Sequence, residues 1–105
     1  MKSIEVTVVR IYLTEAETRL NPLIERLRDQ EKLRGVTVFR GITGFGPSGV
    51  VHSASLLDLS LDLPVVVEFF DEPARVEAVL EHLGTLVAPG HILHWRARMV
   101  DGGNG

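Results

Sequence analysis

The spacing of the apolar positions changes along this chain and predicts where its strands lie. Residues 4–13 are mostly β-branched or aliphatic, which is typical of a strand. Ile4, Val6 and Val8 alternate with polar residues, which indicates that one face is buried. Beyond Val8 both faces become apolar, as expected for a central strand.

Three further segments predict strands, and they cover residues 36–43, 63–70 and 91–100. Gly41 lies inside the first of them, which indicates a bulge or a close approach of two backbones. Pro64 stands near the start of the second, where no ladder hydrogen bond is needed.

Two segments have apolar residues three and four positions apart, which predicts helices. Asn21 and Pro22 mark the start of the first helix, with Asn21 as its cap, and Gly35 marks its end. The acidic residues and proline at 71–73 open the second helix, which we expect to end at residues 89–90. The apolar stripes consist of Leu20, Leu23, Ile24 and Leu27 in the first helix and of Val76, Val79, Leu80 and Leu83, followed by Leu86 or Val87, in the second.

The expected order is therefore β-α-β-β-α-β, an α+β arrangement of the ferredoxin-like type. It consists of one antiparallel four-stranded sheet with both helices on one face. Because the first and third strands are apolar on both sides, the second face of the sheet would expose apolar surface. We therefore expect a homo-oligomer.

A glycine-rich corner at residues 44–47 leads from the second strand into a long connection. We expect a loop over residues 45–62, with one helical turn at residues 53–59. A connection of this length in a small domain is usually functional or mobile. We expect the chain to form one domain over residues 1–100, followed by a disordered tail over residues 101–105.

Composition narrows the functional classes. The chain has 105 residues, no cysteine and a net charge of −3. The missing thiols exclude disulfides, thiol nucleophiles and thiolate metal sites, and the acidic balance disfavours nucleic acid as a partner. The sequence has no signal-peptide pattern and no apolar run of bilayer length, so we expect a cytoplasmic protein that does not insert into membranes.

Residues able to support catalysis are few. The sequence contains serines and His52 in the long loop, but no nucleophile-elbow motif and no metal-ligand spacing, so we expect no enzyme activity. His52 is either a ligand contact or a solvent-exposed side chain. His91 and His94 are three residues apart on one strand and point to opposite faces, which disfavours a metal site made by that strand alone.

Several motifs, taken in order, resemble the PII signal-transduction proteins and, more closely, a family of uncharacterised PII-like bacterial proteins. They are NPLIERL at residues 21–27, TVFRGI at 37–42, GFG at 44–46, His52, and an LS-x-DLPVV-E stretch over residues 59–68. The resemblance implies a ferredoxin-like homotrimer that binds a small effector, with an adenine nucleotide as candidate, in clefts between subunits. It also implies a partner protein engaged through the loop at residues 47–62, with a membrane transporter as one candidate.

The resemblance places Thr37, Gly44 and Gly46 against the nucleotide. We add the neighbouring aromatic residue, the loop histidine and the nearby cations. The predicted ligand-binding residues are therefore Thr37, Arg40, Gly44, Phe45, Gly46, His52, Arg96 and Arg98.

Two features set this chain apart from the PII pattern. It has one more residue between Thr37 and Gly44, and the connector at residues 87–90 carries no cation. Several phosphates in a partly dehydrated cleft need several cations or N–H donors. The residues therefore favour a monophosphate, a cyclic nucleotide or a carboxylate as effector, and no cofactor is assigned.

Other interpretations stay open. Gly44 and Gly46 are also what a sharp turn requires, and Arg96 and Arg98 are also suited to pair with glutamates across strands. The alternative function is a metal-handling protein similar to the CutA relatives of this fold, with His52 and carboxylates as ligands. A third is a small α+β barrel enzyme, which would form a dimer.

Overall fold

A single antiparallel sheet organises the chain. The computed structural model describes residues 1–14, 20–53 and 63–102. The sheet contains β1 (Ser3–Thr14), β2 (Thr37–Arg40), β5 (Pro64–Asp71) and β6 (Ile92–Val100), in the order β2-β5-β1-β6. Every neighbouring pair of strands is antiparallel.

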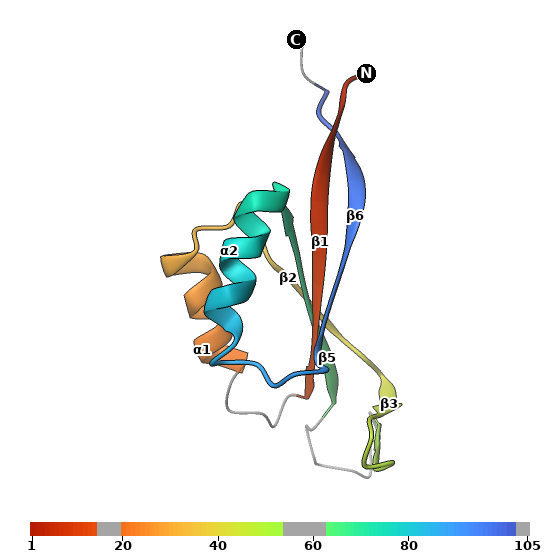
Figure 1. Cartoon of the computed structure of the whole chain (residues 1–105). Coiled ribbons are helices and arrows are strands. Elements are labelled where there is room, and N and C mark those ends of the chain that lie inside the picture. Colours follow the sequence, from red (N-terminus) through yellow and green to blue (C-terminus); the bar gives the residue numbers. More distant parts are fainter. Residues whose placement is uncertain (15–19, 54–62, 103–105) are drawn as a thin grey trace.

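The helices lie together on one face of this sheet (Figure 1). They are α1 (Leu20–Glu25), the π-helical turn η1 (Arg26–Gln30) that continues it, and α2 (Pro73–Leu83). Together with the sheet they complete the ferredoxin-like β-α-β-β-α-β arrangement that the sequence predicts.

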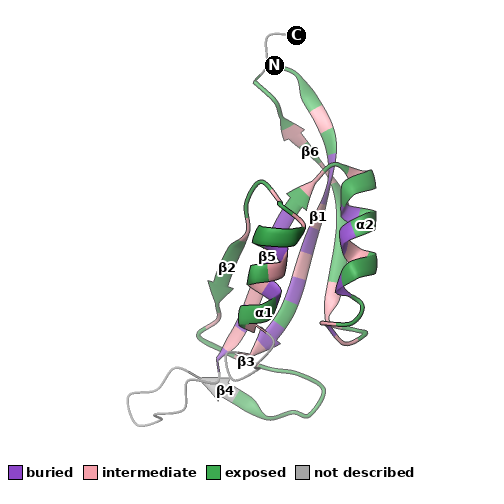
Figure 2. Ribbon diagram, turned by 90° about the vertical axis from the view of Figure 1, so that its left-hand side faces the viewer, coloured by how far each residue is buried: buried purple, intermediate pink, exposed green. Residues whose placement is uncertain are grey.

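The core lies between the sheet and the helices, because successive residues of a strand point to opposite faces. Figure 2 shows it as buried bands along β1 and β5 and on the side of α2 that faces the sheet. The buried residues are Val9, Ile11, Leu13, Val65, Val67 and Phe69 from the strands and Leu23, Leu27, Val76, Val79, Leu83 and Val87 from the helical layer. The predicted stripes of both helices therefore face the core.

The ends of the helices differ from the predicted ones. α1 begins at Leu20, so Asn21 lies inside the helix and does not cap it. The helical segment ends after η1, short of Gly35, because Lys32 adopts a left-handed φ of 53°. α2 begins at Pro73 as predicted but ends at Leu83, and the chain up to Gly90 consists of turns.

The predicted second strand is in fact two strands. β2 stops at Arg40, and β3 (Thr43–Phe45) pairs with β4 (Val51–Ser53) in a separate two-stranded hairpin. The break falls at Gly41, whose backbone N–H donates to the Pro64 carbonyl oxygen at 2.7 Å. A methyl group on Gly41 would lie 2.7 Å from Pro64 Cγ, so this close approach requires glycine.

The hairpin also corrects the prediction for the long loop, because residues 45–53 contain a strand and a turn. The helical turn predicted for residues 53–59 falls, apart from its first residue, outside the described residues, as do residues 103–105 of the predicted tail. Figure 1 shows the hairpin at the end of the molecule far from both termini.

The face of the sheet that points away from the helices carries exposed apolar side chains, and we call it the open face. These side chains are Tyr12, Phe39, Phe70, Leu93 and Trp95. The predicted apolar surface opposite the helices is therefore present. Within the described chain, no helix is both long and apolar enough to cross a bilayer.

Candidate functional site

The glycine corner of the sequence forms the turn of the β3–β4 hairpin. Gly44 lies opposite His52 in the register, and a methyl group on Gly44 would lie 3.3 Å from Pro64 Cγ. A methyl group on Gly46 would have no neighbour within 4 Å. Pro64 thus crowds position 44 within one chain, whereas at position 46 neither a contact nor a positive φ demands glycine.

A hollow of about 400 Å³ lies beside this turn, and we call it the turn pocket. The end of β1 at residues 12–14, the glycine turn at residues 44–48 and the connector at residues 89–91 line it, with Pro64 and Val65 below. None of its described lining residues is an aspartate, glutamate, lysine or arginine. Its polar side chains belong to Tyr12, Thr14, Ser48 and His91.

A second hollow of about 320 Å³ borders the other end of the open face, and we call it the edge pocket. Residues 34–37, residues 68–70 and Met99 line it. Met99 lies opposite Ile4 on β1, eight residues from Tyr12 in the turn pocket. The far end of this pocket is thus about 26 Å from Tyr12, but the nearest lining residues of the two pockets, Val65 and Glu68, are three residues apart on β5, or about 10 Å.

The predicted ligand-binding residues fall into separate groups. Gly44, Phe45 and Gly46 line the turn pocket, whereas Thr37 lines the edge pocket. Arg40 is an exposed residue at the end of β2. The backbone of His52 lies in β4 opposite Gly44, and its side chain is outside the described part of the structure.

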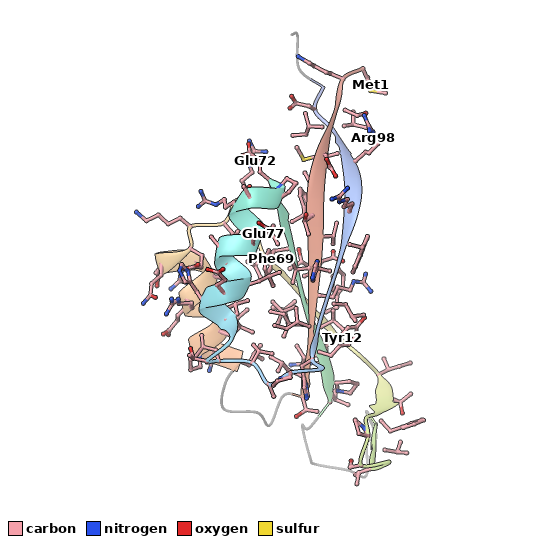
Figure 3. All side chains as sticks on the ribbon, in the orientation of Figure 1. Met1, Tyr12, Phe69, Glu72, Glu77 and Arg98 are labelled. Atoms are coloured by element: carbon pink, nitrogen blue, oxygen red, sulfur yellow. The ribbon has the colours of Figure 1, made fainter. Side chains whose placement is uncertain are left out.

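The two arginines of β6 lie far from the glycine turn. Arg98 is opposite Glu5 on β1, seven residues from Tyr12, which is about 23 Å along the strand. Figure 3 shows Arg98 and Tyr12 at opposite ends of the β1–β6 pair. Arg96 contacts Glu5 at 3.4 Å between Nε and Oε1, on the surface. The expectation of cross-strand pairing with a glutamate is therefore met for Arg96.

Sequence reasoning missed an ion pair at the centre of the open face. Arg10 Nε donates to Glu68 Oε1 at 2.8 Å, and the Arg10 guanidinium lies 5.8 Å from the centre of the Trp95 ring. The hydrogen bond to Glu68, followed by that to Tyr12, raises the pKa of Arg10 above its usual value. The pair joins positions 58 residues apart, so only the β1–β5 register reveals it.

The metal alternative relies on His52, whose side chain lies outside the described part of the structure. Among the described residues, no three histidine, aspartate or glutamate side chains gather around a possible ion. The remaining features are two mainly apolar hollows that border an apolar sheet face with an ion pair at its centre. Such an arrangement suits the binding of a small molecule and of another protein surface.

Comparison with known proteins assigns the family. The family model DUF190, described as "Uncharacterized ACR", matches residues 6–99. The chain belongs to the DUF190 family. A UPF0166 protein of Aquifex aeolicus is 33% identical over 87 residues, which cover 79% of this chain and 83% of the relative. A UPF0166 protein of Methanocaldococcus jannaschii is 32% identical over 84 residues, covering 76% and 77%.

Solved structures share the fold of this DUF190 protein. CPII of Thiomonas intermedia, a nitrogen regulatory PII-like protein bound to ADP, AMP and bicarbonate, matches with a TM-score of 0.67 at 16% identity, covering 95% of this chain and all of CPII. A Thermus thermophilus protein described as a PII-like signalling protein matches with a TM-score of 0.57 at 15% identity, covering 94% and 91%. The resemblance to uncharacterised PII-like proteins is thereby confirmed.

Proposed function

We propose that this DUF190 protein is a homotrimeric PII-like regulator in the cytoplasm, which acts by binding an adenine nucleotide between its subunits. It then engages a partner protein through residues 47–62, and a membrane transporter is one candidate partner. The observation that carries this proposal is that Gly44, Phe45 and Gly46 line one pocket while Thr37 lines another, and that both pockets border one uncovered sheet face.

The open face supports self-association. Its five exposed aromatic and aliphatic side chains surround the Arg10–Glu68 pair, which satisfies the charges that association would dehydrate. The molecule is also extended: its radius of gyration is 15.7 Å, compared with about 13 Å for a compact domain of this size. The first residues of β1, up to Val6, pair with β6 alone and extend past the end of β5 (Figure 1). Such an arm gains contacts when a second subunit packs against it.

The two pockets support a site between subunits. In a ring of identical subunits, each contact joins one patch of a subunit to a different patch of the next. The turn pocket of one subunit would then meet the edge pocket of its neighbour, which unites Gly46 and Thr37. The arginines at the far end of β6 would enter the same cleft and supply the cations that the turn pocket lacks. CPII, which shares this fold, binds ADP and AMP.

The hairpin supports partner binding. Ile42, Phe45, Val50 and Val51 are exposed apolar residues on or beside it. Exposed apolar side chains of this kind mark protein interaction sites more often than chance placement does. An effector beside the turn at Gly46 would change how these side chains are presented.

Light scattering and calorimetry test this function together. We expect a mass of three times the 11.6 kDa of one chain, and heat on titration with AMP or ADP. Arg98→Ala should weaken binding by about tenfold or more, because a charge-assisted hydrogen bond contributes about 1.5–3 kcal/mol. Arg28→Ala is the matched control, because Arg28 lies on the helical layer and pairs with Asp29.

Four results would contradict the proposal. A monomeric mass would exclude a cleft between subunits. A dimeric mass would favour the small α+β barrel enzyme instead. If titration with adenine compounds gave no heat, an adenine nucleotide would be excluded as the effector. If the Arg98→Ala variant and the wild type bound the nucleotide with equal affinity, Arg98 of the neighbouring subunit would not be part of the site.

A further inference from the structure

The ring of His91 is held in place at the rim of the turn pocket. Its Nδ1 lies 2.8 Å from the carbonyl oxygen of Tyr12. The backbone is held as well, because the Tyr12 N–H donates to the His91 carbonyl at 2.9 Å and the His91 N–H donates to the Ala88 carbonyl at 3.3 Å. Gly90, with a φ of 88°, turns the chain immediately before it. Little conformational freedom is therefore left to lose when a ligand binds to this ring.

The contact with Tyr12 determines which nitrogen carries the hydrogen. A carbonyl oxygen accepts and never donates, so Nδ1 must be the protonated nitrogen. The second nitrogen, Nε2, is the one left for a ligand. It is an acceptor in the neutral ring and becomes a charged donor when the ring is protonated.

The lining of the turn pocket makes this nitrogen chemically distinctive. Tyr12, from β1, is the other titratable residue among its described lining residues, and the glycine turn contributes none. The Ser48 hydroxyl already accepts the Val50 N–H at 3.3 Å. Among the described residues of this lining, His91 is thus the one with a side chain that can become a cation by gaining a proton.

We propose that His91 binds an oxyanion, through a protonated Nε2, and that binding takes up a proton. The oxyanion is the phosphate of a bound nucleotide or a free anion such as inorganic phosphate. This inference rests on the proposed function, since it specifies how the same site recognises its ligand. A single ionisable cation on this side of the cleft favours one phosphate group over a longer chain of them.

Calorimetry with AMP, adenosine, and adenosine plus inorganic phosphate tests the inference. His91→Gln retains an amide donor for the Tyr12 carbonyl but has no charge. We expect it to weaken AMP binding about tenfold or more and to change adenosine binding less than about twofold, since a hydrogen bond to a charged group is worth about 1.5–3 kcal/mol. His94→Gln is the matched control, because His94 lies within β6, three residues beyond His91, and lines neither pocket.

Proton uptake gives a second readout. Because the proposed contact needs the protonated ring, AMP binding should be accompanied by proton uptake, with at most one proton for each site. Repeating the titration in buffers with different ionisation enthalpies measures this number. We expect no uptake in His91→Gln. His91→Lys carries a permanent charge and should retain AMP affinity within a few-fold without proton uptake.

The outcomes separate this inference from the proposed function. If no adenine compound binds the wild type, both fail. If AMP binds and His91→Gln binds it equally, or adenosine binding falls as much as AMP binding, only the role of His91 fails. If His91 matters for inorganic phosphate beside adenosine but not for AMP, the oxyanion is a free anion. A long-range ¹H–¹⁵N spectrum of the ligand-free protein that finds the hydrogen on Nε2 would also overturn the inference.

Discussion

Leu93 offers the sharpest test of self-association through the open face. Its side chain is 53% exposed and lies opposite Arg10, which already pairs with Glu68. Leu93→Lys therefore adds a cation for which this ion pair leaves no partner. In the isolated chain the change is a surface substitution, and we expect it to alter the free energy of unfolding by less than about 0.5 kcal/mol.

The effect on assembly is much larger. Burying the exposed half of a leucine contributes about 1 kcal/mol, and dehydrating an unpaired charge costs several kcal/mol. Three symmetric copies of the substitution multiply both terms. The total penalty is on the order of 10 kcal/mol for each trimer, or about seven orders of magnitude in the association constant.

Analytical ultracentrifugation at micromolar concentration measures this difference. The wild type should sediment with three times the mass of one chain, and Leu93→Lys with the 11.6 kDa of a single chain. His94→Lys is the control, because alternation along β6 places it on the other face, and it should remain a trimer. Circular dichroism checks that both variants are folded. A folded Leu93→Lys variant that stays trimeric would refute the proposal that the subunits associate through the open face.

Two matched pairs test the packing. Gly41→Ala should lower the free energy of unfolding by about 1–3 kcal/mol through its clash with Pro64. Gly46→Ala should leave thermal stability unchanged but weaken AMP binding, and a stable Gly41→Ala would contradict the first account. Phe69→Ala should lower the urea-unfolding free energy by about 3–5 kcal/mol, because Phe69 is 2% exposed. Phe45→Ala, at a position 75% exposed, should leave the urea-unfolding free energy nearly unchanged. If both variants lost the same unfolding free energy, the assignment of Phe69 as buried and Phe45 as exposed would be wrong.

The candidate site was partly predictable. The motif at residues 44–46 led to the turn pocket, because glycine allows tight turns that other residues disfavour and the following proline fixes its own φ, and both effects are local. The placement of the His91 ring was not predictable, since the ring contacts a carbonyl 79 residues earlier in the chain. The Arg10–Glu68 pair was not predicted for the same reason, because its two residues meet only when β1 and β5 pair in register.

The sequence by itself determined the order of the elements and which side of each faces the core. Both follow from the spacing of apolar residues, which is a property of neighbours along the chain. The tertiary structure decided where the second strand breaks, because that depends on Pro64 lying against Gly41. It also decided that Thr37 lies apart from the glycine turn at residues 44–46 and that Arg96 and Arg98 lie outside both pockets, since these positions follow from strand registers that local spacing does not encode.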